Sequence, residues 1–247
     1  MSAGHSPTAF VRRAREAPRQ AAAFARLSPV ARAMLRERLT YLSPVKLRRL
    51  EEAVREVDAA GVPGAIAEFG VALGGVSIAL ASASPERALH GFDVFGMIPA
   101  PTERDGEHAQ QRFEVIESGH SRGIRGGEYY GYMDDVLGAV RASFARHGVD
   151  ADGGRVSLHQ GLFEETWPRL ADEIGPLALV HVDCDWHDPV AFVLEAVAPH
   201  VSPAGVIVVD DYVTYEGARD ATDAFMAAHP EFERRHLDES LSLRRHP

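Results

Sequence analysis

The stretch LVHVDCDW, residues 179–186, is the strongest indicator of the fold, because a short apolar, β-branched run ends there in acidic side chains. A second stretch of the same kind, GVIVVDDY, follows at residues 205–212. Strands that are apolar throughout are typical of a parallel sheet covered by helices on both faces. Because the carboxyl ends of such strands form the ligand crevice, we expect one pocket to receive Asp183, Asp185, Asp210 and Asp211.

The clustering of these four acids itself predicts a site. Like charges packed together repel unless something neutralises them. A hard divalent cation with oxygen ligands does so, and Mg²⁺ is held in proteins by a few carboxylates together with water. The ordinary alternative is that acids at strand ends only solvate loops or cap the next helix, but a doubled cluster favours a functional site.

Strand and helix patterns alternate through residues 64–247. Strands are expected at residues 64–69, 88–92, 155–159, 177–182 and 206–209, with a C-terminal antiparallel hairpin at 232–236 and 241–244. Helices are expected between them, at 76–83, 132–147, 169–174, 189–199 and 217–229. This alternation predicts an α/β fold with a doubly wound, mostly parallel, Rossmann-like sheet. No linker is evident, so we expect a single domain over residues 1–247.

Two segments differ from this core. Residues 1–60 are rich in Ala and Arg with spaced apolar positions, and Ser43-Pro44 is a typical helix start. We interpret them as an N-terminal helical cap or as a contact in a homo-oligomer, a dimer or larger. Residues from about 95 to 130 are rich in Gly, Pro and charge with little periodicity, which favours a lid over the ligand pocket.

The composition limits the classes of partner. A formal net charge of −10 argues against binding to nucleic acids or membrane surfaces, so small molecules are the expected ligands. No apolar run approaches the roughly 20 residues needed to cross a bilayer. Cys184 is the only cysteine, which favours a reducing compartment, and we expect the cytoplasm. Lys46 is the only lysine, and we expect no lysine beside the acidic strand ends.

A glycine-rich turn, GVALGG at residues 70–75, follows the first expected strand, and the next strand ends in Asp93. Glycines allow a backbone to approach a ligand closely, and the helix that follows offers unpaired N–H groups. With Ala72 at its centre, the turn also passes for a loose dinucleotide fingerprint, so an NAD(P)-dependent oxidoreductase is one alternative. A turn that serves packing alone is another.

Five motifs, taken together in their order and spacing, resemble one family. They are Glu68-x-Gly70-x-x-x-Gly74-Gly75, Gly91-Phe-Asp93-x-Phe95-Gly96-x-Ile-Pro99, Gly161-x-Phe163-x-Glu165-Thr166-x-Pro168, His181-x-Asp183-x-Asp185 and Asp210-Asp211-Tyr212. Over about residues 40–232 the chain resembles the macrocin- and mycinamicin-type sugar O-methyltransferases. The resemblance implies a class I methyltransferase fold that uses S-adenosylmethionine and Mg²⁺ to methylate a deoxysugar hydroxyl in antibiotic biosynthesis. It leaves open whether the acceptor is a nucleotide sugar or a finished glycoside.

The resemblance also implies roles for individual residues. Metal binding is implied for Asp183, Asp210 and Asp211. Cofactor binding, with Glu68 and the glycine turn at the methionine part and Asp93 at the ribose, is implied for Glu68, Gly70, Val71, Gly74, Gly75, Ser77, Asp93, Phe163 and Asp183. Three places depart from the family pattern. Ala72 replaces a common glycine, Val94 stands where relatives are often polar, and Trp186-His187 replaces an apolar–Tyr pair, which makes His187 a candidate acceptor contact or second base.

The chemistry requires a base, because a sugar hydroxyl must lose its proton as it takes the methyl group. A cation that bridges vicinal hydroxyls would lower their pKa and fix one oxygen in line with the methyl group. Asp183 and Asp185 are both candidates for the base. His181, inside an apolar strand, is expected to be a core histidine instead. A non-catalytic protein of this fold that binds small molecules is the remaining alternative.

Overall fold

One sheet of seven strands organises the protein. A computed structural model describes residues 7–151 and 154–247, so residues 1–6 of the expected cap lie outside the described residues. The strand order is β3-β2-β1-β4-β5-β7-β6. The strands are β1 (Ala65–Phe69), β2 (Leu89–Asp93), β3 (Val156–Gln160), β4 (Leu177–Val182), β5 (Val201–Val209), β6 (Phe232–Leu237) and β7 (Leu241–Arg245). Strands β1 to β5 are parallel, whereas β7 pairs antiparallel with β5 and β6. The predicted doubly wound sheet with its C-terminal hairpin is confirmed.

The strand order reverses between β1 and β4. From β1 the chain adds β2 and β3 on one side, and then crosses over to add β4 and β5 on the other. Every side chain of β1 and β4 is buried, which explains why these strands are apolar almost throughout. Ligands of such sheets bind outside the carboxyl ends of the strands at this reversal, so the crevice is expected beyond β1 and β4.

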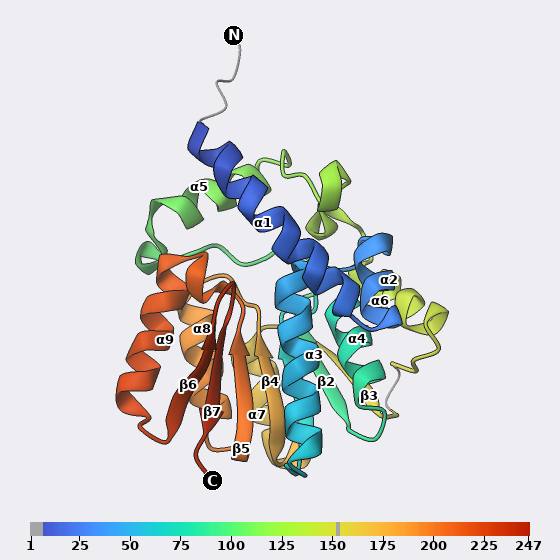
Figure 1. The fold of residues 1–247 in the computed structure, drawn as a ribbon, viewed down its shortest axis with the longest axis vertical. Coiled ribbons are helices and arrows are strands. Elements are labelled where there is room, and N and C mark those ends of the chain that lie inside the picture. Colours follow the sequence, from blue (N-terminus) through green and yellow to red (C-terminus); the bar gives the residue numbers. More distant parts are fainter. Residues whose placement is uncertain (1–6, 152–153) are drawn as a thin grey trace.

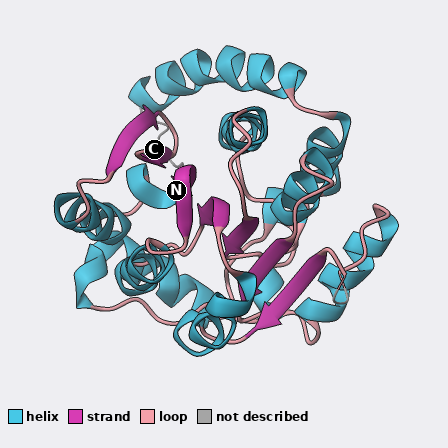
Figure 2. Ribbon diagram, turned by 90° about the horizontal axis from the view of Figure 1, so that it is seen from below, coloured by secondary structure: helices cyan, strands magenta, loops and turns pink. Residues whose placement is uncertain are grey.

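Helices cover both faces of the sheet, as Figure 2 shows. They are α1 (Pro7–Arg26), α2 (Pro29–Glu37), α3 (Pro44–Ala59), α4 (Gly75–Ala83), α5 (Gly106–Glu117), α6 (Val136–Arg146), α7 (Phe163–Ile174), α8 (His187–Val197) and α9 (Glu216–Ala228). One hydrophobic cluster packs α3, α4 and α6 against one face. A second cluster packs α7, α8 and α9 against the other. None of the helices in the described ranges is both long enough and apolar enough to pass through a membrane.

The N-terminal helices form as the sequence predicts. Ser43 is the N-cap of α3: its side chain accepts the Lys46 N–H at 3.2 Å, and Pro44 is the first helical residue. Helix α3 lies on the sheet beside β4 and β5. Helix α1 crosses the end of the molecule above α3, close to the ends of the strands that hold the acidic motifs (Figure 1). These helices therefore stand next to the crevice.

Three elements differ most from the expected ones, whereas the ends of others, such as α6, shift by up to four residues. Helix α5 forms within the segment expected to lack periodicity, because Ala109 and Ile116, two turns apart, give it a narrow buried stripe in an otherwise polar sequence. Helix α7 begins at Phe163 instead of residue 169, since Pro168 removes only one helical N–H and the helix continues through it. Strand β5 begins at residue 201 instead of 206, with a register shift in its pairing to β4.

Candidate active site

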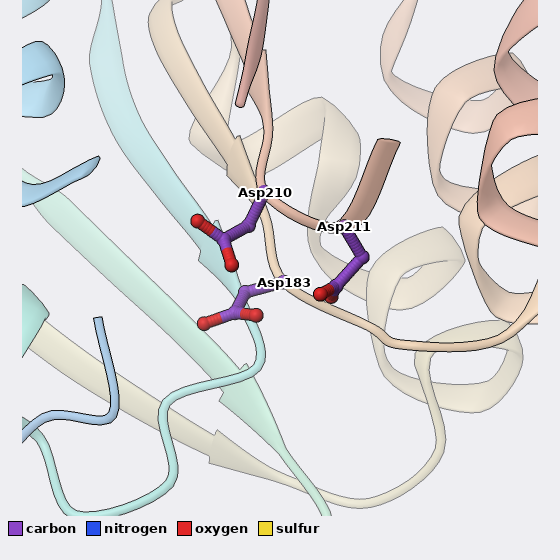
Figure 3. Close-up of side chains that lie close together, drawn as sticks. All are labelled: Asp183, Asp210 and Asp211. Atoms are coloured by element: carbon purple, nitrogen blue, oxygen red, sulfur yellow. The ribbon is translucent and has the colours of Figure 1, made fainter. Parts of the chain in front are cut away.

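Asp183, Asp210 and Asp211 converge where β4 and β5 end (Figure 3). The two strands are adjacent and parallel, so the residues that follow them emerge side by side. Backbone bonds hold them there: the Asp183 N–H donates to the Phe69 carbonyl at 2.8 Å, and the Asp210 N–H donates to the Val182 carbonyl at 2.9 Å. One carboxylate oxygen from each aspartate lies within 4.8 Å of the others. We call these three residues the acidic floor.

The acidic floor is electrostatically unfavourable on its own. Burial, followed by the charges of Asp210 and Asp211, raises the pKa of Asp183 well above its ordinary value. Burial and the same two neighbours raise the pKa of Asp185 in the same way. Burial and repulsion from Asp210 raise the pKa of Asp211 to about 6. Carboxylates that raise one another's pKa favour a proton or a cation between them, and three oxygen donors suit a hard divalent ion.

Lys46 lies beside the acidic floor, so the expectation that no lysine would do so is wrong. Its Nζ donates to Asp210 Oδ2 at 2.5 Å, from the first turn of α3. Burial lowers the pKa of Lys46, but the charges of Asp210 and Asp211 outweigh burial and raise it, so the ammonium stays protonated. The two residues are 164 positions apart, and no local sequence pattern signals a contact over that distance.

Asp185 borders the acidic floor without belonging to it. Its N–H donates to Asp211 Oδ2 at 3.2 Å, and its φ of 60° is in the left-handed region. Ala72 and Phe95, which follow β1 and β2, have the same conformation with φ of 48°. Such angles cost non-glycine residues about 1 kcal/mol or more and cluster at functional sites. A glycine would adopt this angle at position 72 without strain.

His187 lies outside the cavity, although its neighbours Trp186 and Asp188 line it. It begins α8, where its N–H donates to Asp105 Oδ1 at 2.5 Å. Its ring Nδ1 pairs with Asp188 Oδ1 at 2.7 Å. The structure therefore gives no geometric support for His187 as an acceptor contact or second base. The His187 N–H instead holds the start of α5, because it donates to the buried Asp105, the residue before that helix.

Glu68 and Ser77 lie beneath the crevice instead of lining it. Both are fully buried, and the Ser77 hydroxyl donates to Glu68. Glu68 Oε1 also lies 3.1 Å from Nδ1 of His181, which is fully buried and matches the expected core histidine. This polar group supports β1 and β4 from within. The neighbouring Cys184 is buried, its Sγ donates to the Phe69 carbonyl at 3.5 Å, and burial raises the pKa of its thiol, which favours the protonated form.

Asp93 closes the turn that follows β1. Its Oδ2 accepts the N–H groups of Val71 at 2.8 Å and Ala72 at 2.9 Å, and its Oδ1 accepts that of Phe95 at 2.6 Å. Burial raises the pKa of Asp93, while these three bonds counteract the rise. Asp93 lines the cavity, and Oδ1 has the greater remaining capacity to accept a hydrogen bond.

The glycines bring separate backbones into contact. A Cβ on Gly70, whose φ is 98°, would lie 1.9 Å from the Asp183 carbonyl oxygen, so the turn and the acidic floor touch there. The Gly75 N–H at the start of α4 donates to the Leu39 carbonyl at 2.9 Å. Gly74 packs against α6, where a Cβ would lie 2.8 Å from the Phe144 ring. The first N–H of α4 is thus bonded within the protein.

A cavity of about 710 Å³ opens over these elements. The cofactor residues expected from the sequence divide into two groups. Four line the cavity: Gly70, Asp93, Phe163 and Asp183. Five support it from behind: Glu68, Val71, Gly74, Gly75 and Ser77. Among the residues that the structure describes, two cations line it, Lys46 and Arg112, against nine carboxyl side chains. These are Asp93, Asp105, Glu164, Glu165, Asp183, Asp185, Asp188, Asp210 and Asp211.

Aromatic side chains form the wall above the acidic floor. The Trp186 and Tyr215 rings pack edge to face with centroids 5.1 Å apart, and Trp186 Nε1 donates to the Pro99 carbonyl at 2.9 Å. The Arg112 guanidinium, on α5, lies 6.0 Å from the Tyr129 ring centroid. Neither Arg112 nor Tyr215 belongs to a motif in the sequence, so neither could be assigned a role from it. Their only signal is a polar segment that carries large side chains.

Comparison with known proteins agrees with this geometry. The family model described as macrocin-O-methyltransferase (TylF) matches residues 12–234. A curated 4'-O-methyltransferase of Streptomyces olivaceus, which acts on 8-demethyl-8-(2,3-dimethoxy-alpha-L-rhamnosyl)-tetracenomycin C, is 32% identical over 189 residues. That match covers 74% of this chain and 65% of the enzyme's length. The mycinamicin III 3''-O-methyltransferase of Micromonospora griseorubida is 26% identical over 183 residues, 70% of this chain and 65% of its own length.

Solved structures support the same fold. The O-methyltransferase NovP superposes with a TM-score of 0.68 at 24% identity, over 84% of this chain and 82% of that one. The calicheamicin methyltransferase CalS11 superposes with a TM-score of 0.58 at 25% identity, over 98% of this chain and 94% of that one. The class I methyltransferase fold is confirmed, and the match over residues 12–234 shows that the chain belongs to the macrocin O-methyltransferase family.

Proposed function

We propose that this chain is an S-adenosylmethionine-dependent O-methyltransferase that acts on a sugar hydroxyl, with a divalent cation such as Mg²⁺ bound at the acidic floor. Family membership and the names of the relatives support the reaction. One observation carries the metal: Asp183, Asp210 and Asp211 offer three oxygens within 4.8 Å of one another below a cavity. Such a set suits Mg²⁺, which prefers oxygen ligands.

The cofactor would lie between the turn after β1 and the start of α7. Gly70 lines the cavity there, Asp93 Oδ1 can accept a hydrogen bond from a hydroxyl, and Phe163 offers a ring beside them. When bound, S-adenosylmethionine supplies a methyl group on a sulfonium. The net negative charge of the lining suits a cationic sulfonium. Glu68 and Ser77 would act indirectly, by holding the strand and helix that shape this part of the cavity.

Asp185 is the residue that we propose as the base. When bound, a divalent cation lowers the pKa of hydroxyls that it contacts. Asp185 lies outside the three-carboxylate group yet lines the same cavity, so its carboxylate is available to accept a proton. Lys46 holds Asp210 in place by the bond at 2.5 Å, and its raised pKa prevents it from serving as a base near neutral pH.

The alternatives fit the geometry less well. A nicotinamide cofactor would need free N–H groups in the glycine turn for its pyrophosphate. The N–H groups of Val71, Ala72 and Gly75 are all bonded within the protein. A purely non-catalytic binding protein would leave the acidic floor without a role.

The proposal is tested by three measurements on the purified chain. Calorimetry should show binding of S-adenosylhomocysteine, and not of NAD⁺. Transfer of a labelled methyl group to a panel of deoxysugar glycosides and nucleotide sugars should require Mg²⁺ and cease with excess chelator. Asp185→Asn should abolish methyl transfer, but Mg²⁺ should still raise its melting temperature. Asp210→Asn should lose both methyl transfer and the stabilisation by Mg²⁺. Full activity after exhaustive chelation would overturn the proposed requirement for a divalent cation. A lack of binding to S-adenosylhomocysteine would overturn the proposed methyl transfer from S-adenosylmethionine.

A further inference from the structure

Two histidine side chains meet near the edge of the sheet, away from the acidic floor. His90 stands on β2 and His159 on β3, which is the edge strand (Figure 1). His90 Nδ1 lies 3.1 Å from His159 Nε2, and the planes of the two rings differ by 8°. Neither side chain lines the cavity. We propose that this histidine pair binds one divalent transition-metal ion of the Zn²⁺ class, at a site separate from the acidic floor.

The distance between the two nitrogens suits a shared metal ion. Zn–N bonds are about 2.0 to 2.1 Å long, so two neighbouring nitrogen ligands on a tetrahedral or octahedral ion lie about 2.8 to 3.4 Å apart. The observed distance of 3.1 Å falls within that range. Without a metal, one N–H···N hydrogen bond joins the rings. An ion bound beside the line between the two nitrogens would replace the proton of that bond.

The surroundings of the histidine pair favour neutral imidazoles that solvent can reach. Burial lowers the pKa of His90 below its ordinary value, although the charge of Glu173 counteracts this. Burial, followed by repulsion from His90, lowers the pKa of His159 to about 4. Near pH 7 both rings therefore present the neutral form, which is the form that binds metals. Both residues are half-buried, so an ion and its waters have access to them.

Packing holds the histidine pair in place before any metal binds. His159 stacks on Phe92 with ring centroids 4.6 Å apart, and Phe92 stacks in turn on Phe69 at 4.8 Å. The pairing of β2 with β3 fixes the backbones, with His159 opposite Phe92. Glu173, near the end of α7, adds a negative charge that acts on His90. Ligands that are already ordered and a nearby negative charge both favour binding of a divalent cation.

The donor atoms distinguish the histidine pair from the acidic floor. Imidazole nitrogen suits Zn²⁺, Cu²⁺ and Ni²⁺, whereas Mg²⁺ prefers oxygen ligands. Two protein ligands leave the remaining positions of the ion to water, so we expect a dissociation constant for Zn²⁺ of about 1 to 100 μM. The ion would link β2 to β3, which pairs with no other strand in the described sheet. Bound Zn²⁺ should therefore slow amide exchange in β3.

The test titrates the full chain with Zn²⁺ by calorimetry, in excess Mg²⁺ so that oxygen sites are occupied. His90→Gln and His159→Gln should each weaken Zn²⁺ binding at least tenfold, with circular dichroism spectra that match the wild type. With Cu²⁺ in place of Zn²⁺, electron paramagnetic resonance should show coupling to imidazole nitrogen that both variants lose. His200→Gln is the matched control and should keep the wild-type affinity, because His200 packs against Trp167 on the same face of the sheet.

Ser157 provides a gain-of-function arm. It stands on β3 opposite His90 and two residues before His159, so its side chain faces the same side of the sheet. Ser157→His adds a third imidazole and should tighten Zn²⁺ binding at least tenfold, whereas Ser157→Asn should not. No gain in Ser157→His would overturn the inference. Equal Zn²⁺ affinity in the wild type, His90→Gln and His159→Gln would also overturn it, and would show that the two rings only share a hydrogen bond.

Discussion

Asp211→Asn should stabilise the metal-free protein at neutral pH. Burial, and then repulsion from Asp210, raise the pKa of Asp211 from 3.8 to about 6, so the folded chain binds this proton more tightly than the unfolded chain does. Between about pH 4 and pH 6 the free energy of unfolding therefore falls as the pH rises. Above pH 6, ionised Asp211 lowers the free energy of unfolding by its full amount, which is at most about 3 kcal/mol. Asn cannot ionise and keeps an oxygen that can accept the Asp185 N–H. We expect a gain of about 1 to 3 kcal/mol at pH 8.

The measurement is urea unfolding with a chelator present, at steps from pH 4 to pH 8. Wild type and Asp211→Asn should have equal stability near pH 4 and diverge progressively above it. Asp188→Asn is the matched control, because Asp188 lines the same cavity but lies outside the acidic floor, with a side chain that is 47% exposed. Added Mg²⁺ should stabilise the wild type and leave Asp211→Asn almost unchanged. If Asp211→Asn is less stable than wild type at pH 8 without metal, the acidic floor is not under repulsion.

Three further predictions follow from single contacts. Lys46→Met leaves Asp210 without its cation and should lower the free energy of unfolding by about 2 to 3 kcal/mol in the presence of a chelator. Added Mg²⁺, or the variant Lys46→Arg, should restore the stability, and an equal loss with Mg²⁺ present would refute this prediction. Gly70→Ala places a Cβ 1.9 Å from the Asp183 carbonyl oxygen, and urea unfolding should show a loss of more than about 3 kcal/mol in the free energy of unfolding. The control Gly61→Ala, where no atom lies within 4 Å of the added Cβ, should lose about 1 kcal/mol. Trp186→Phe removes the donor to the Pro99 carbonyl and should speed amide exchange over residues 99–117 without changing affinity for S-adenosylhomocysteine; unchanged exchange would show that this bond does not hold the segment.

The sheet could be predicted because its information is local. Each strand is a short apolar run, and the period of the pattern identifies it without knowledge of its neighbours. Helix α5 could not be predicted in this way, because it buries only a narrow stripe and most of its residues face solvent or the cavity. The start of α7 was missed because Pro168 normally indicates a helix start, whereas here it lies within the helix.

The acidic floor was predictable for a related reason. Adjacent parallel strands that end at the same height bring their next residues together, so Asp183 and Asp210 meet without any further information. Residues of the site that do not stand directly after a strand could not be predicted in this way. Arg112 and Tyr215 reach the cavity from elements whose place in space depends on tertiary packing. His187 shows the converse, since its neighbours line the cavity while its own ring turns to Asp188.

The N-terminal segment contributes parts of the site that the core lacks. Three residues within one short stretch act on three different features: the Leu39 carbonyl caps Gly75 at the start of α4, Tyr41 lines the cavity, and Lys46 neutralises Asp210. A fragment of residues 64–247 would keep the sheet and every acid of the floor, yet lose one wall and the cation nearest to the floor. We expect such a fragment to bind S-adenosylhomocysteine at least tenfold more weakly and to need higher Mg²⁺ for stability, as calorimetry and thermal unfolding would measure. An affinity for S-adenosylhomocysteine equal to that of the full chain would show that the N-terminal segment does not contribute to cofactor binding.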